Sequence, residues 1–432
     1  MEMKTQSHSD SERQGPVYLL WDESQFWGIL LWRCLAAWHV PLRLVRAADI
    51  ARGLLRESPP AALFVPGGWA RLKAHALGPE GRRAVNEYLH AGGTYLGICG
   101  GAGLALPDNG GLALCPLCRK PVDDRLPNFS GYVTAAPLRP HALVPGDCPP
   151  LIHLPVWWPS QFTAPQGPGV EILASYVQPG PDFWVSDLPL EQIAVEERAS
   201  CEQLYGINLD PELIRGEPCV VSGTLGQGRY ILTYAHLESP ASPMANSWLG
   251  HILSLLSGQP FGLSNSLTAP DWDLAGTNVV WDEPGLTALA EDLESIIRLG
   301  TRHFLLFWRY PWLLGWRRGI PGFVLTTLYA QVQTIRSLKP NPRAQAYWNQ
   351  AADELRHQMR LFRKKMEFYL VGERLAMHTS TYSPQLNSRI RLHEQRKELI
   401  GRFPGHGGLF GSMAASLDEL VWLAAEPAGH DS

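Results

Sequence analysis

The sequence predicts an α/β fold with a doubly wound, mostly parallel sheet, followed by a smaller all-α region. Short apolar runs alternate with helical segments over residues 17–106, and connections of this length join parallel strands by right-handed crossovers. Beyond residue 285 the apolar residues recur at helical spacing. Because 432 residues exceed the usual size of one compact domain, we expect two.

The first domain begins as an alternation of strands and helices. Strands are expected at 17–22, 41–47, 61–68 and 94–98, and helices at 25–38, 48–55 and 78–93. In the last of these helices a proline near the start and glycines after the end give the usual helix punctuation. Residues 110–216 are irregular, with a short strand-like run at 171–177. Residues 218–239 then predict a hairpin around a glycine turn, and 242–258 a closing helix.

Composition marks the domain boundaries. Residues 1–15 are polar and are expected to form a disordered tail, whereas 16–262 form the α/β domain. Residues 263–284 are rich in Pro, Gly and Ser, which is typical of a linker. Residues 285–432 then form a helical domain of unknown role.

Charge and cysteine usage exclude several protein classes. A formal net charge of -4 argues against a nucleic-acid partner. Seven scattered cysteines indicate a reducing compartment. The N-terminus lacks the apolar core of a signal peptide. The sequence also has no uninterrupted run of about 18 apolar residues, the length that a membrane span requires. We therefore expect a cytoplasmic protein.

Cys99 is the first candidate for chemistry. It follows an apolar strand and lies in the pattern Gly97-x-Cys99-x-Gly101, which is the pattern of a nucleophile elbow between a strand and a helix. The N-terminus of the helix would favour a thiolate there. The alternative is a buried structural cysteine beside a glycine-rich turn.

Other residues can complete a site around Cys99. His236 leaves the end of an apolar strand, and Glu238 follows it, so they can supply a base and the carboxylate that orients it. Gly67 and Gly68 end the strand that precedes the Cys99 strand. The N–H groups of Gly68 and Gly100 can form an oxyanion hole. Trp157 and Trp158 are interpreted, together with Gly67, as lining a substrate pocket, although burial in a core also explains such a tryptophan pair.

These motifs in this order resemble the class I glutamine amidotransferase-like superfamily. More closely, "VPGG", "GPEGRRAVNEYLHAGGTYLGICGGAGLAL" and "GQGRYILTYAHLES" resemble the N-terminal domain of biotin–protein ligases, over roughly residues 16 to 262. The resemblance implies a flavodoxin-type sheet with Cys99 as nucleophile, His236 as base and Glu238 as the orienting carboxylate.

The sequence departs from that superfamily at two positions. Members that hydrolyse glutamine typically carry Gln in a G-x-C-x-G-x-Q pattern, where this chain has Gly103, and the usual His-Pro-Glu is His236-Leu237-Glu238. No synthetase domain and no biotin-ligase catalytic motif follows. The departures favour a substrate other than glutamine, and no cofactor is implied. Cys115 and Cys118 lack a second pair at comparable spacing, so we expect no metal site.

Two functions remain open. The first is a cysteine hydrolase that acts on a carboxamide or related acyl substrate, a small molecule. The second is a non-catalytic binding or regulatory module that keeps the fold and responds to a small-molecule ligand. The aromatic surface around Trp308, Trp312 and Trp316, expected on a helix, needs a cover. We expect the first domain or a protein partner to provide it, rather than a membrane surface.

Overall fold

The computed structural model describes residues 15–163, 169–257, 267–382, 388–402 and 405–426. The chain divides into two compact units: unit 1 comprises Met1–Ser24 and Leu30–Pro270, and unit 2 comprises Gln25–Ile29 and Asp271–Ser432. Residues 1–14 of the predicted tail and 263–266 of the predicted linker lie outside the described residues. The predicted domain boundaries stay predictions.

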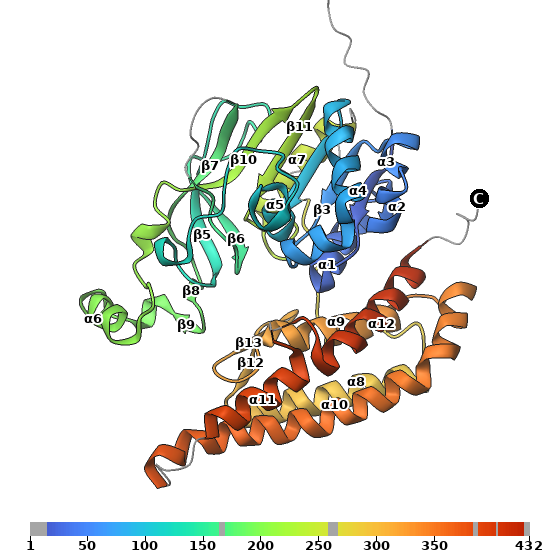
Figure 1. Cartoon of the computed structure of the whole chain (residues 1–432). Helices are drawn as coiled ribbons and strands as arrows, with labels where there is room; N and C mark the ends of the chain where they lie inside the picture. The colour runs from blue at the N-terminus through green and yellow to red at the C-terminus, as the bar shows by residue number, and fades with distance from the viewer. Residues whose placement is uncertain (1–14, 164–168, 258–266, 383–387, 403–404, 427–432) are drawn as a thin grey trace, which may run out of the picture. The chain divides into compact units, whose positions relative to one another are not determined.

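Unit 1 is built on one sheet whose first half is parallel (Figure 1). Its strand order, β2-β1-β3-β4-β11, is that of a doubly wound sheet, so the predicted α/β class is confirmed. These strands are β1 (Val17–Leu20), β2 (Leu42–Val45), β3 (Ala62–Val65), β4 (Thr94–Ile98) and β11 (Gly228–Thr233).

Antiparallel strands extend the sheet beyond β11. The order continues β10-β7-β5-β8-β9, and β6 pairs with β5. The predicted hairpin is β10 and β11, which pair antiparallel, and the predicted short strand is part of β7. β5 and β6 were not predicted from the sequence. These strands are β5 (Phe129–Pro137), β6 (Ile152–Trp157), β7 (Val170–Pro179), β8 (Trp184–Val185), β9 (Leu188–Pro189) and β10 (Pro218–Leu225).

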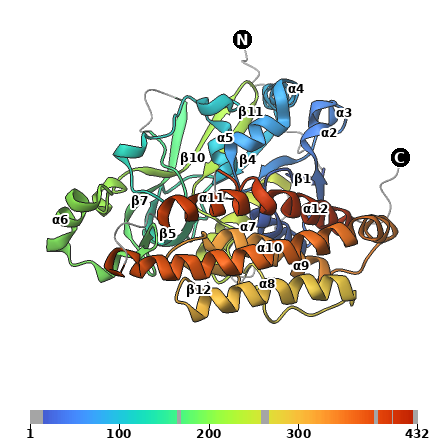
Figure 2. The same cartoon turned by 60° about the horizontal axis from the view of Figure 1, so that its bottom comes forward.

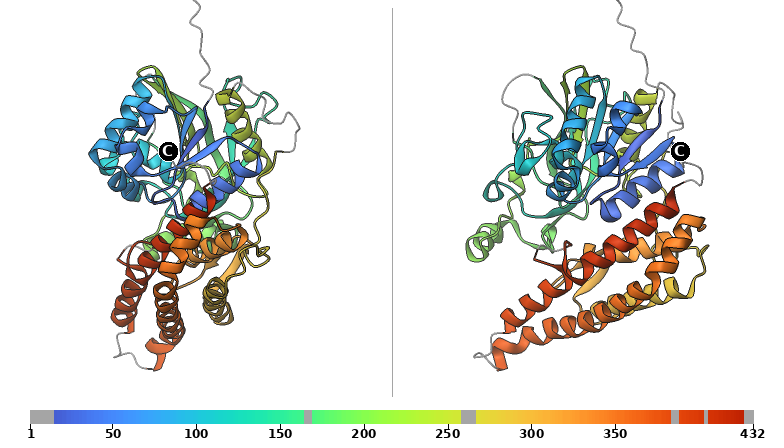
Figure 3. Two further views of the ribbon diagram at one scale, coloured as in Figure 1. Left: turned by 90° about the vertical axis from the view of Figure 1, so that its right-hand side faces the viewer. Right: turned by 45° about the vertical axis from the view of Figure 1, so that its right-hand side comes forward.

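Helices cover both faces of the sheet. Figure 3 (left) shows α4, in light blue, and α7, in yellow-green, on opposite sides of it. The face under α4 is an apolar core in which strand residues such as Tyr95 and Tyr230 pack with Leu77 and Val85 of α4. The helices are α1 (Gln25–Ala37), of which residues from Leu30 on belong to this unit, α2 (Ala47–Ala51), α3 (Leu54–Glu57), α4 (Ala70–His90), α5 (Gly100–Ala105), α6 (Val195–Tyr205) and α7 (Pro243–Ser257).

Two glycines shape the helices of unit 1 differently from the prediction. Gly53, at φ 105°, separates α2 from α3 where one helix was expected. Gly78 (φ 61°) is a non-helical break inside α4, so the helix expected from Gly78 is the second part of α4, and a first part that begins at Ala70 was not expected. The N-terminal end of α4 therefore follows closely on Gly67 and Gly68.

Unit 2 is helical, with one hairpin. Figure 2 shows α8 alongside α10, and these two helices are in contact. α9 lies almost wholly buried and packs on α8, α12 and the hairpin. The elements are α8 (Pro284–Arg302), β12 (Leu306–Tyr310), β13 (Leu313–Trp316), α9 (Gly322–Ser337), α10 (Pro342–Tyr382), α11 (Ser388–Ile400) and α12 (Gly408–Ala425).

The expectation of a tryptophan-rich helix is wrong. Trp308, Trp312 and Trp316 lie in the hairpin formed by β12, β13 and their turn, because Pro311 and the glycine at 315 suit a turn and a tightly packed strand better than a helix. Trp312 is only 3% exposed, whereas Trp308 is 38% exposed. Rings of unit 2 pack on all three: the ring centroids lie 6.3 Å apart for Trp308 and Tyr329, 5.9 Å for Trp312 and Tyr310, and 6.3 Å for Trp316 and Phe323.

Candidate active site at the carboxyl ends of the parallel strands

Cys99 lies in the sharp turn between β4 and α5. Its backbone adopts φ 49° and ψ −101°, a left-handed conformation that non-glycine residues rarely adopt. Cys99 N donates to Thr233 O at 2.7 Å, which ties the turn to the end of β11. The side chain is half-buried. The geometry is that of a nucleophile elbow, as the glycine spacing predicts.

The glycines around Cys99 allow backbone segments to touch. A Cβ added at Gly101 would lie 1.9 Å from Val65 O, and one at Gly97 would lie 2.7 Å from Gly101 C. A Cβ at Gly100 would lie 1.9 Å from Gly68 O. No side chain fits at these positions unless the backbone moves. The close packing therefore joins the elbow to β3 and to the turn after it.

Gly68 and Gly100, the predicted oxyanion donors, are neighbours. Gly68 has φ 106° and packs against the backbone of Glu23, which fixes the turn after β3. Gly100 begins α5, and the first N–H groups of a helix have no partner within it. Gly67 is buried and precedes this contact. The structure thus brings the two predicted donors to the elbow.

His236 and Glu238 form a buried pair in the turn that follows β11. His236 Nδ1 lies 2.8 Å from Glu238 Oε1, and both side chains are 0% exposed. The imidazole also lies close enough to Cys99 for this residue to contribute to the raised pKa of His236. The three residues are therefore contiguous, although His236 lies far from Cys99 in the sequence.

The carboxylate decides the charge of the imidazole. Burial alone would lower the pKa of His236, but the negative charge of Glu238 and the neighbouring Cys99 raise that pKa to about 10. An imidazolium beside a thiol is suited to stabilise a thiolate and to donate a proton.

Buried polar contacts hold the His236–Glu238 turn in place. Asn246 of α7 donates to Leu237 O at 2.8 Å and to Ser239 O at 3.0 Å. His236 N donates to Pro155 O of β6 at 2.8 Å. Nothing in the sequence identified Asn246, because its partners are backbone atoms of a turn whose position depends on the tertiary fold.

Trp157 and Trp158 differ in their relation to Cys99. Trp157 O lies 3.9 Å from Cys99 Sγ, and its indole, 1% exposed, donates to Ser239 Oγ at 3.0 Å. Trp158 is half-buried, at φ 53°, with its ring 6.5 Å from that of Trp157. Trp157 is thus a buried support beside Cys99, which matches the core alternative more than an open pocket wall.

A second thiol lies near the site and was not predicted from the sequence. Cys34 of α1 is 0% exposed, and burial together with the negative charge of Glu238 raises its pKa well above its ordinary value. A neutral, buried thiol is a poor nucleophile. Cys34 is therefore an internal reference for Cys99.

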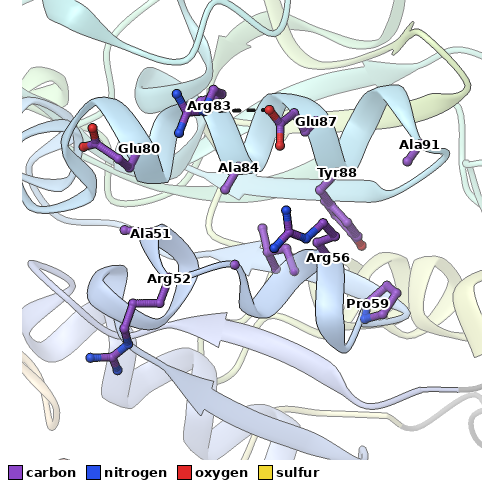
Figure 4. A pocket seen from close by; sticks show the side chains of 12 residues that line it. Ala51, Arg52, Arg56, Pro59, Glu80, Arg83, Ala84, Glu87, Tyr88 and Ala91 are labelled. Carbon is purple, nitrogen blue, oxygen red and sulfur yellow. Dashed lines mark ion pairs between the residues drawn. The ribbon is translucent and has the colours of Figure 1, made fainter.

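A pocket of about 480 Å³ lies elsewhere in unit 1, between α2, α3 and α4 (Figure 4). Its lining includes Arg52, Arg83, Glu80 and Tyr88, and none of the predicted site residues. It contains no cysteine or histidine, so we do not assign the chemistry to it. Within the described ranges, no cluster of three or more His, Cys, Asp or Glu side chains is placed to hold a metal ion.

Comparisons with known proteins give only distant similarity. No family model matches the chain, and no curated protein matches it. A candidate GMP synthase subunit from Thermoplasma acidophilum has a TM-score of 0.37 and 13% identity, over 56% of this chain and 95% of that one. PurLQS from Thermotoga maritima has a TM-score of 0.37 and 11% identity, over 56% and 97%. The β-galactosidase of Bacillus circulans has 0.35 and 13%, over 57% and 32%.

At these identities the comparisons do not identify a substrate. Among the described residues, no helix combines the length and the hydropathy that a membrane span requires.

Proposed function

We propose that unit 1 is an amidotransferase-like cysteine hydrolase that acts on a carboxamide or related acyl substrate. The observation that carries the proposal is the strained backbone of Cys99, at φ 49°, beside a buried His236–Glu238 pair whose imidazole is influenced by Cys99. Strain of this kind persists where the surroundings over-determine it, and it is concentrated at functional sites. A structural cysteine needs neither the strain nor the imidazole.

In the proposed reaction the Cys99 thiolate attacks the carbonyl carbon, and the N–H groups of Gly68 and Gly100 stabilise the oxyanion. The tetrahedral intermediate collapses as His236 gives its proton to the leaving amine. The C–N bond breaks, and the acyl group remains on Cys99 as a thioester. His236 then accepts a proton from water, whose oxygen attacks the thioester. The acid is released, and the thiolate is restored.

The motifs that resemble the amidotransferase-like superfamily support the same reaction class. Gly103 takes the place of the glutamine-site residue, and a Cβ there would lie 3.1 Å from Arg119 Nη2. An arginine thus lies beside the position where glutamine-hydrolysing members carry Gln. This arrangement supports a substrate other than glutamine. The narrower likeness to the N-terminal domain of biotin–protein ligases rests on the sequence motifs.

The test is hydrolysis of a panel of carboxamides, followed as ammonia or amine release. We expect Cys99→Ala to reduce the rate on the accepted substrate at least about 10⁴-fold, because the covalent route is lost. Cys201→Ala, which removes a partly exposed thiol on α6, is the matched control and should keep the wild-type rate. Equal turnover by the Cys99→Ala variant would overturn the proposal. A ligand that binds but is not hydrolysed would favour the regulatory module.

A further inference from the structure

Two arginines that the sequence alone did not single out lie beside the elbow. Arg119 Nη2 lies 3.1 Å from the point that a Cβ on Gly103 would occupy. Gly103 N donates to Cys99 O at 2.9 Å, so this guanidinium lies one helical turn from the nucleophile. Arg119 Nε is buried and has no hydrogen-bond partner among the described residues.

The backbone fixes the position of Arg119. Its N–H donates to Asp108 Oδ2 at 2.6 Å, and its backbone pairs with that of Phe162. The Asp108 carboxylate is therefore engaged by the main chain of Arg119. The guanidinium projects from this bridge toward α5.

Arg125 lies in the segment that follows α5, and its side chain contacts the segment that follows Trp157. Arg125 Nη1 donates a hydrogen bond to Ser160 Oγ. Three residues earlier in the same segment, Trp157 O accepts a hydrogen bond from the Cys99 thiol. Ser160 precedes Phe162, which pairs with Arg119, by two residues, so both arginines lie along the same short segment. Burial and the like charge of Arg119 lower the pKa of Arg125, which agrees with this placement.

Tyr234 links both arginines to the nucleophile. The register pairs Ile98 with Thr233, so Cys99 and Tyr234 leave their strands side by side. Burial raises the pKa of Tyr234, the positive charges of Arg119 and Arg125 oppose that rise, and Cys99 adds to it. The two arginines, the tyrosine and the thiol thus belong to one electrostatic cluster.

Two like charges in a partly buried place are costly unless an anion joins them. No ion pair among the described residues involves either guanidinium. Guanidinium groups match carboxylate and phosphate oxygens in geometry and charge. The geometry points to an anion-binding subsite, formed by Arg119 and Arg125, that selects carboxamide or acyl substrates bearing a carboxylate or a phosphate. This inference rests on the proposed function, because it assigns a substrate class to the same site.

The first test compares two alkylating reagents of similar size at Cys99, neutral iodoacetamide and anionic iodoacetate, by mass spectrometry. The thiolate displaces iodide from both reagents, so the ratio of their rates is independent of thiol ionisation. We expect Arg119→Gln and Arg125→Gln each to lower the iodoacetate-to-iodoacetamide ratio about tenfold, and Arg119→Lys to restore part of it. Arg229→Gln is the matched control, because it removes an exposed charge at the other end of β11.

The second test does not need a reactive thiol. Inorganic phosphate is expected to raise the unfolding midpoint of Cys99→Ala, but not that of the double variant Cys99→Ala/Arg119→Gln. An alkylation ratio that changes no more in Arg119→Gln and Arg125→Gln than in Arg229→Gln would overturn the subsite, as would phosphate stabilisation that is absent or independent of Arg119. If Cys99 is no more reactive than Cys34 toward iodoacetamide, yet phosphate stabilises through Arg119, then the hydrolase fails and the anion site stands.

Discussion

The elbow around Cys99 and the turn that carries His236 and Glu238 reach the same point of unit 1 by different physical means. The elbow is fixed by contacts between backbones: Gly100 and Gly101 touch the chain after β3 and within it. The turn is fixed by buried side chains. Asn246 donates hydrogen bonds to two backbone carbonyls of the turn, and Glu238 pairs with the His236 imidazole.

This difference determines what each region tolerates. Backbone contacts leave no room for one more carbon atom, but they are indifferent to charge. The polar turn is sensitive to the loss of a hydrogen bond or of a charge, because each partner is buried. We therefore expect added side-chain volume to destabilise the elbow, and the loss of a hydrogen bond or a charge to destabilise the turn.

The largest effect should come from adding one methyl group to the elbow. Gly101→Ala places a Cβ 1.9 Å from Val65 O, so we expect unfolding of unit 1 to become easier by more than about 3 kcal/mol. The measurement is urea unfolding, monitored by the chemical labelling of Cys34 and detected by mass spectrometry. The Cys34 thiol is 0% exposed in the folded protein, so it reacts on unfolding.

Gly103→Ala is the matched control on the same short helix. Its Cβ would meet only the end of the Arg119 side chain and the Ala70 side chain, at 3.1 and 3.3 Å. We expect the free energy of unfolding to change by less than about 1 kcal/mol, because side chains can move aside. Both substitutions gain the same helix propensity, so the difference between the two variants reports the backbone contact. If both variants unfold alike, backbone contact is not what fixes the elbow.

The elbow was predictable because its requirements are local. Gly97, Cys99 and Gly101 follow a buried strand directly, and the buried parallel strands around them read as apolar runs. The predicted strands therefore fell in the right places, and Cys99 lies in the turn between β4 and α5. His236 and Glu238 were predictable as candidates because they leave the end of such a strand.

The supports of the site were not predictable in the same way. Asn246 acts on backbone atoms of another element, and Arg119 and Arg125 lie in the region whose sequence pattern is irregular. There β5 and β6 pair antiparallel around prolines, which obscures their alternation. Trp157 was noticed, but its role depends on Ser239, a partner 82 residues away.

A smaller effect should follow from removing the polar clamp of the turn. Asn246→Leu keeps a similar volume but loses hydrogen bonds to Leu237 O and Ser239 O and the one accepted from Ala269 N at 2.8 Å. We expect a loss of about 2 kcal/mol in the same unfolding assay. Ser254→Ala on the same helix should change stability by less than about 0.5 kcal/mol. Equal losses in the two variants would show that the clamp does not stabilise the turn.

The smallest effect concerns charge in the turn, and it depends on pH. His236 has a pKa of about 10 in the folded protein, against about 6.5 in an unfolded chain. A raised pKa stabilises the fold fully below pH 6.5, and this contribution is lost as the pH rises toward 10. Between these values the folded state holds the extra proton, so the free energy of unfolding should fall by about 1 kcal/mol from pH 7 to pH 8.

Glu238→Gln should remove that dependence. The substitution keeps the shape of the side chain but removes the negative charge, and the burial that remains lowers the pKa of His236. The imidazole is then neutral in both states above pH 7, so this group contributes no slope. Urea unfolding of both proteins at pH 7 and pH 8 compares the slopes directly. Parallel slopes would mean that Glu238 does not hold the proton on His236, and the polar turn would then depend on hydrogen bonds alone.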